Sequence, residues 1–219
     1  MGTSYEGVLV VAGVEAVREA LVRAEVTAIV APVGVERTAI LPREGAYNVA
    51  EVDDLARYLS GTCGFSVLVH TLYDSDLLSL YVYRGGDCVH EYQSEMAYLG
   101  TPFEDEDGEM KVELGGVLYA SDDESLPTGP CGADPEVFST FGTGHVDHDR
   151  LGALLRCEGL DDEDACMYAQ GLHWAVSEAL NLQPAALTEA YRHANVSDYP
   201  GAALVGPSRN EPSAGAALL

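Results

Sequence analysis

The first 95 residues alternate between strand-like and helix-like segments, and this order restricts the possible folds more than any other feature of the chain. Residues 6–12 (EGVLVVA) are dominated by apolar side chains, as is typical of a buried strand. Apolar side chains then recur at spacings of three and four: Val14, Val17, Leu21 and Val22. This periodicity predicts a helix over residues 14–24 with one buried face. Two further strands are predicted over residues 26–32 and 38–41.

A second helix is marked at both ends by residues that favour helix termini. Asn48 is predicted to be the N-cap, and Glu51 follows it three residues later, as in a capping box. Gly61 lies just past the expected last turn, where glycine commonly ends a helix. Between these ends the apolar side chains fall on one face: Val52, Leu55 and Leu59.

Strands rich in β-branched and aromatic residues are predicted over residues 65–73, 77–84 and 88–92. The dipeptide Gly85-Gly86 joins the last two, because glycine readily adopts the positive φ angles of a two-residue hairpin turn. The resulting order predicts an α+β fold, namely a ferredoxin-like β-α-β-β-α-β sheet with an added hairpin strand, followed by a C-terminal helical segment. An α+β sheet with a different strand order is the alternative.

The expected register of this hairpin sorts its side chains onto two faces. Pairing through the diglycine turn gives Tyr83–Cys88, Tyr81–His90 and Ser79–Tyr92 on one face and Val82–Val89 on the other. His70, in the neighbouring strand, joins the polar face if its register allows. Tyrosine and histidine combine a large rigid surface with a polar tip, so this face is a candidate for partner binding. The alternative is that the face packs under the C-terminal helices.

Charge and cysteine usage limit the classes of partner and compartment. The chain has 11 lysines and arginines against 36 aspartates and glutamates, a formal net charge of −25. This charge repels nucleic-acid phosphates and anionic lipids, and it favours a basic protein partner. The alternative is that the charge serves only solubility or a high-salt cytoplasm. The apolar runs are shorter than the roughly 20 residues of a membrane span. Five cysteines without paired spacing, and no recognisable signal peptide, lead us to expect reduced thiols and a cytoplasmic protein.

Residues 101–136 differ in composition from the rest of the chain. They carry eleven acidic residues against one basic residue, Lys111, with proline and glycine interspersed. We expect an exposed acidic linker or loop, with one short strand over residues 116–120. The densest acidic run supplies further candidate partner-binding residues: Glu104, Asp105, Glu106 and Asp107.

The last third of the chain is predicted to be mainly helical. Helices are expected over residues 147–157, 162–180 and 184–194. Proline, glycine, serine and alanine without periodicity then predict a flexible tail over residues 197–219. The domain division that follows is an α+β sheet domain over residues 1–100, an acidic linker over 101–136, a helical segment over 137–196 and the tail.

The histidines of the C-terminal part are candidate metal ligands or catalytic groups. His145, Asp147 and His148 form the densest cluster of potential metal ligands, since imidazole and carboxylate groups bind zinc and related ions. The alternative reading makes Asp147 a helix N-cap and His148 an exposed first-turn residue. His173, beside Trp174 in the long predicted helix, fits a buried structural histidine better than a catalytic one.

The hairpin region resembles an uncharacterised family of bacterial proteins. The resemblance lies in the Asp74-Ser75-Asp76 triplet, the two tyrosines and glycines of residues 81–86, and the Glu91-Tyr92-Gln93-Ser94 segment. It covers about residues 45–100. No activity is known for that family, so the resemblance implies a shared domain and no particular chemistry.

Three functions are compatible with the sequence. The first is a non-enzymatic acidic binding protein, of the immunity or regulatory type, that captures a basic protein partner. The second is a small-molecule or metal-dependent enzyme that uses the tyrosine and histidine face of the hairpin. The third is a structural adaptor subunit of a larger assembly. The sequence favours a non-enzymatic role, and we expect no cofactor.

Overall fold

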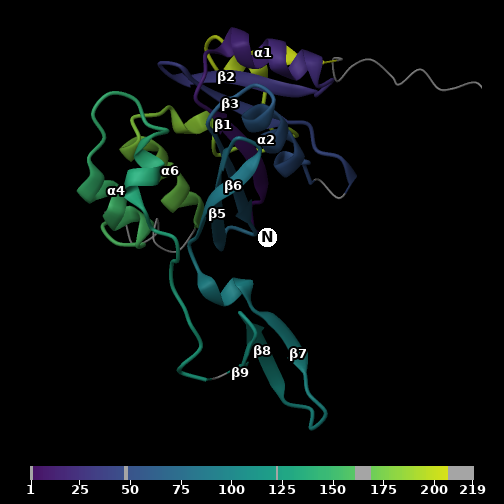
Figure 1. Cartoon of the computed structure of the whole chain (residues 1–219), viewed down its shortest axis with the longest axis vertical. Helices are drawn as coiled ribbons and strands as arrows, with labels where there is room; N and C mark the ends of the chain where they lie inside the picture. The colour runs from purple at the N-terminus through teal and green to yellow at the C-terminus, as the bar shows by residue number, and fades with distance from the viewer. Residues whose placement is uncertain (1, 47–48, 122, 161–168, 207–219) are drawn as a thin grey trace, which may run out of the picture.

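A seven-stranded antiparallel sheet forms the body of the protein (Figure 1). The computed structural model describes residues 2–46, 49–121, 123–160 and 169–206 of the 219-residue chain. In sheet order the strands are β10 (Ala203–Val205), β2 (Ala28–Gly34), β3 (Arg37–Pro42), β1 (Tyr5–Val10), β4 (Val67–Tyr73), β5 (Leu77–Arg84) and β6 (Asp87–Gln93). The predicted α+β class is confirmed, and β1 lies between β3 and β4 with antiparallel pairing to both.

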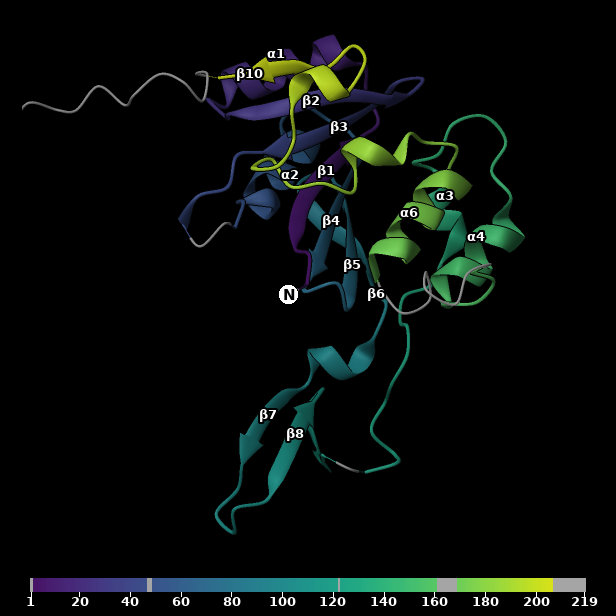
Figure 2. The same cartoon turned by 180° about the vertical axis from the view of Figure 1, so that it is seen from behind.

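Helices cover both faces of this sheet, and each layer buries its own apolar core. Helices α1 (Val14–Arg23) and α2 (Val52–Gly61) pack on one face. Helices α3 (Pro135–Ser139), α4 (His148–Leu155) and α6 (Ala169–Ala179) pack on the other, where Figure 2 shows them side by side. Alternate side chains of one strand therefore enter different cores.

Both predicted early helices are present, but the start of α2 and the buried face of α1 differ from the sequence prediction. Helix α2 begins at Val52, with Glu51 at the N-cap position and without a side-chain capping bond, whereas Asn48 lies outside the described residues. The Ala50 N–H donates to Oε2 of Glu6 at 2.6 Å, so the chain before the helix is bound to strand β1 instead. In α1, Val22 is 65% exposed and does not belong to the buried face that was predicted for it.

The β5–β6 hairpin has the predicted diglycine turn but a different register beyond it. Tyr83 pairs with Cys88 as expected. A β-bulge then shifts the pairing, so that Tyr81 lies opposite Glu91, and not opposite His90. Because one extra residue reverses the alternation of side chains, the two strands do not share the single polar face that we predicted.

A second, smaller sheet projects from the body as an arm (Figure 2). It consists of β7 (Thr101–Glu104), β8 (Met110–Leu114) and β9 (Val117–Ala120) in that order. The predicted strand over residues 116–120 is thus present, but two further strands replace the expected acidic loop. At the base of the arm the Glu95 carboxylate accepts the Ala97 N–H at 3.0 Å and the Gly129 N–H at 2.8 Å, which joins the two connections to the body.

Within the described part of the C-terminal third, residues 184–194 are less helical than predicted, whereas residues 162–168 of the predicted helix 162–180 lie outside the described ranges. Residues 184–194 form only a 3-10 turn at Pro184–Ala186, followed by further turns. One reason is that the Arg192 N–H donates to Glu44 at 3.2 Å, a contact with the β3–α2 loop that replaces a helical bond. Strand β10 lies within the predicted tail, because Ala203–Val205 pairs with the otherwise open edge of β2. Among the described helices, none is long and apolar enough to cross a membrane.

Candidate functional site

The bulge in strand β6 divides the tyrosines and histidines that we predicted to form one partner-binding face. Tyr81 and Tyr83 lie on the side of α2, where the Tyr83 hydroxyl donates to Asp53 at 2.8 Å and the Tyr81 hydroxyl accepts from Gln93 at 2.9 Å. His90 and Tyr92 lie on the opposite side of the sheet, beside helix α3. The predicted set is therefore not a single surface.

His90 and Tyr92 pack against the C-terminal helices, which was the alternative interpretation of this face. Their rings meet Phe138 edge-on, with ring centroids 5.3 Å and 6.1 Å away. Nε2 of His90 bonds to the Gly132 carbonyl at 2.8 Å. Tyr92 is fully buried, and its burial raises the pKa of its hydroxyl. These contacts make Tyr92 part of the core and leave His90 half-buried at its edge.

His70 belongs to a buried cluster with Tyr5 and His173. Nδ1 of His173 lies 2.9 Å from the Tyr5 hydroxyl, and the two imidazole centroids are 4.7 Å apart. Burial lowers the pKa of His173 to about 3, and burial together with the charge of His173 lowers the pKa of His70 well below its usual value. Both rings are therefore neutral at pH 7. The adjoining cavity of about 10 Å³ has room for one water molecule and not for a substrate.

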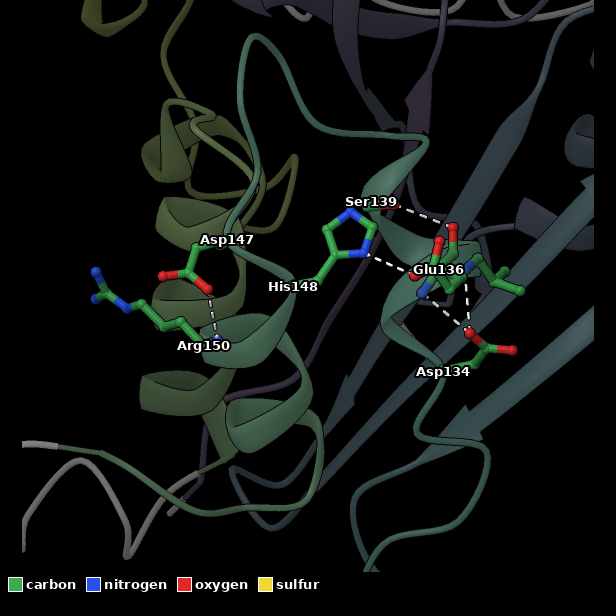
Figure 3. A network of polar contacts seen from close by, with 7 residues as sticks. Asp134, Glu136, Ser139, Asp147, His148 and Arg150 are labelled. Carbon is green, nitrogen blue, oxygen red and sulfur yellow. Dashed lines mark hydrogen bonds and ion pairs between the residues drawn. The ribbon is translucent and has the colours of Figure 1, made fainter.

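The predicted metal ligands lie in the loop before helix α4 and at its first residue, and Figure 3 shows how two of them are engaged. The Asp147 side chain caps α4 by accepting the Arg150 N–H at 3.0 Å, and Nδ1 of His148 lies 3.0 Å from Oε1 of Glu136. His145 lines a cleft of about 430 Å³ together with Asp147 and His148. Within the described ranges, no group of three or more His, Cys, Asp or Glu side chains is placed to hold a metal ion. The capping role predicted as the alternative for Asp147 is confirmed.

The predicted acidic run lies at the far end of the arm, in and beside the turn between β7 and β8. Asp105 is held within this turn: it accepts the N–H groups of Asp107 at 3.0 Å and Glu109 at 2.9 Å, and these bonds help to lower its pKa. Lys111 lies 3.7 Å from Asp105 and 2.8 Å from Glu109. Glu104, Glu106 and Asp107 are exposed and project from the tip.

The two faces of the arm differ in composition. The strand register places six apolar side chains, with Glu104 beside them at the tip, on the face that we call the arm apolar face: Pro102, Met110, Val112, Leu114, Val117 and Tyr119. Met110 and Val117 are 50% and 51% exposed, and no side chain of this face belongs to either core of the body. The other face, the arm acidic face, carries Asp105, Glu109 and Glu113 with Lys111, and it also carries the apolar side chains of Phe103, Leu118 and Ala120.

The sequence contained one signal for this arm that we did not use. Gly115-Gly116 separates two short strand-like segments in the same way as Gly85-Gly86 does, and both of its glycines have positive φ angles, 60° and 81°. Leu118 and Val117, both exposed, could not be assigned to a site without the register of the hairpin.

The chain shows no significant match to protein-family models, to curated proteins or to solved structures.

Proposed function

We propose that this protein is a non-enzymatic acidic binding protein, of the immunity or regulatory type, that holds a basic protein partner with its arm. One observation carries the proposal: the arm exposes acidic and apolar side chains together on a small sheet that projects from the body. Residues 101–120 contain six carboxylates and one lysine, a net charge of −5. Exposed apolar patches bordered by charge are typical of protein interaction sites.

Charge supplies the long-range part of this recognition. The net charge of −25 attracts a cationic protein toward the whole molecule, and such steering raises association rates most at low ionic strength. Glu104, Glu106 and Asp107 at the tip are candidates for direct ion pairs because they are exposed. Each exposed pair stabilises a complex by about 0.2–1 kcal/mol, so charge alone gives a weak complex.

The arm apolar face supplies the short-range part. Burying an exposed aliphatic side chain contributes about 1.5–3 kcal/mol when burial is complete. Met110 and Val117 are half-exposed, so each offers a share of that amount to a partner. Apolar contact therefore adds the affinity that surface ion pairs lack.

A charge-neutralising variant of the tip tests the proposal. The variant Glu104→Gln/Glu106→Gln/Asp107→Asn removes three exposed carboxylates from the arm. The matched control Glu19→Gln/Asp54→Asn/Asp149→Asn removes three exposed carboxylates from the body, so both variants have the same net charge.

The probe is a nine-residue peptide of alternating lysine and valine, measured by calorimetry at 20 mM and 150 mM salt. We expect the tip variant to bind about fivefold or more weakly than the wild type, and the body control to bind within about twofold. We also expect affinity to fall with salt. Equal losses in both variants would show that only total charge matters and would refute the role of the arm.

We further propose that β1 to β4 with α1 and α2 form a ferredoxin-like unit, to which β5, β6 and β10 are additions. The order β2-β3-β1-β4, with antiparallel pairing throughout, supports this assignment. Both helices also pack on the same face of these strands.

A further inference from the structure

The two edges of the arm differ in the backbone groups that they present to solvent. Leu114 and Val117 flank the two-residue Gly115-Gly116 turn, and a pair in that position shares hydrogen bonds across the hairpin. The bond from the Ser121 N–H to the Met110 carbonyl, at 3.2 Å, continues the same alternation. The N–H groups of Leu118 and Ala120 therefore point away from β8, toward the open edge of β9.

The opposite edge is protected against further pairing. The bond from the Asp105 N–H to the Glu109 carbonyl, at 3.0 Å, fixes which residues of β7 bond to β8. The backbone groups of Pro102 and Glu104 therefore face the open edge. Proline has no N–H to donate, and an edge carboxylate discourages pairing. Strand β9, by contrast, contains neither proline nor a charged residue in Val117–Ala120. It is the edge at which a further strand can form.

We propose that the basic partner adds an extended strand to the edge of β9, and that this strand alternates apolar and basic residues. The inference rests on the proposed function and specifies how the partner is recognised. Residues of the added strand opposite Val117 and Tyr119 extend the arm apolar face. Residues opposite Leu118 and Ala120 lie on the arm acidic face, within reach of Glu113 for a long side chain.

Charge selects a cationic strand over a second copy of this chain. Pairing β9 with the β9 strand of another molecule would bring together two arms that each carry a net charge of −5. Like charges placed side by side oppose such pairing. Lysine or arginine on the added strand instead attracts the negative charge of the arm. β9 spans four residues, so the core of the recognised segment has about the same length.

Backbone methylation of a peptide probe tests strand addition with the wild-type protein. Two peptides share the alternating lysine and valine sequence, and they differ in which residue type carries N-methyl groups. One lysine lies opposite Leu118, whose outward N–H and carbonyl bond to the added strand. Another lies opposite Ala120, which offers only its N–H because its carbonyl already accepts the Asp123 N–H at 3.0 Å. The N–H groups of the valines face solvent. We expect methylation of the lysines to weaken binding about tenfold or more and methylation of the valines to leave it within about threefold.

Variants of β9 test the same contact from the protein side. Leu118→Pro removes an outward N–H, and Leu118→Ala keeps this N–H while removing the same side chain. We expect a loss of about tenfold or more for Leu118→Pro and of less than about threefold for Leu118→Ala. Ala120→Pro serves as a second variant if Leu118→Pro disturbs the arm. In the wild type, amide exchange of Leu118 and Ala120 should slow when the peptide binds.

Each contrary result has a distinct meaning. Equal binding of the two methylated peptides, with unchanged exchange at Leu118 and Ala120, would overturn strand addition. The tip variant would still weaken binding in that case, so the proposed function would survive. A stable dimer by sedimentation, with Leu118 and Ala120 protected before any peptide is added, would show that the occupant is a second copy and would overturn the cationic strand.

Discussion

The buried histidine pair predicts that acid destabilises the protein in a defined pH range. His173 has its pKa lowered to about 3 by burial, whereas in the unfolded chain it has the ordinary value near 6.5. Above pH 6.5 the ring is neutral in both states, so it does not change the free energy of unfolding with pH. As the pH falls below 6.5, only the unfolded chain takes up the proton, so stability is lost until the folded pKa is reached.

The size of the effect follows from the difference in pKa. Each pH unit between the two values lowers the free energy of unfolding by about 1.36 kcal/mol. Between pH 7.5 and pH 5 the loss due to His173 is therefore about 2 kcal/mol, and below pH 3 it approaches about 5 kcal/mol. His173 is only 4% exposed, so solvent screening does not reduce this figure much. His70, whose pKa is also lowered, adds a loss of the same sign.

Urea unfolding followed by the fluorescence of Trp174, the only tryptophan, measures this loss. The comparison uses Tyr5→Phe and Tyr5→Phe/His173→Leu, because removing His173 alone would leave the Tyr5 hydroxyl without its partner at 2.9 Å. All other titrating groups are common to both proteins. We expect the difference in unfolding free energy to change by about 2 kcal/mol between pH 7.5 and pH 5 in favour of the double variant. Parallel pH profiles would refute the reasoning.

Three further substitutions probe the packing of the body. Phe138→Ala should lower the free energy of unfolding by about 3–5 kcal/mol, because the ring is fully buried against His90; thermal and urea unfolding measure this. Gly132→Ala places a Cβ atom 1.9 Å from the Glu91 carbonyl, at a φ of +72°, and should cost about 1–3 kcal/mol and speed amide exchange along β6. His148→Ala should change the melting free energy by no more than about 0.5 kcal/mol, because its contact with Glu136 is exposed; a larger loss would show that this contact is structural.

Segments with strong local signals were predictable from the sequence. The buried run before α1, the periodicity of Val17 and Leu21, and the Gly85-Gly86 turn each correspond to the expected element. Such signals depend on the residues of one segment and need no knowledge of the rest of the chain.

The features that were missed depend on contacts between distant segments. Val89 has no sequence signal that marks it as the extra residue of a bulge, yet the shift in pairing decides which core receives Tyr92. Ala203–Val205 has no strand periodicity and becomes β10 because the edge of β2 is available. Residues 184–194 have helical spacing, but bonds from Arg192 to the β3–α2 loop favour turns. Tertiary contacts override local propensity at each of these places.

Of the residues predicted to bind a partner, the acidic run of the arm stays accessible, whereas the tyrosines and histidines of the body are largely covered. A polar face of a sheet is available to a partner only if no other layer covers it, and helix α3 packs on the side of the edge strand β6 that carries His90. The arm has no such layer, and none of its described residues belongs to either core of the body. Substitutions in the arm should therefore change partner binding without changing the unfolding of the body, and substitutions such as Phe138→Ala should do the reverse. A single melting and binding measurement on each set of variants can separate the two roles.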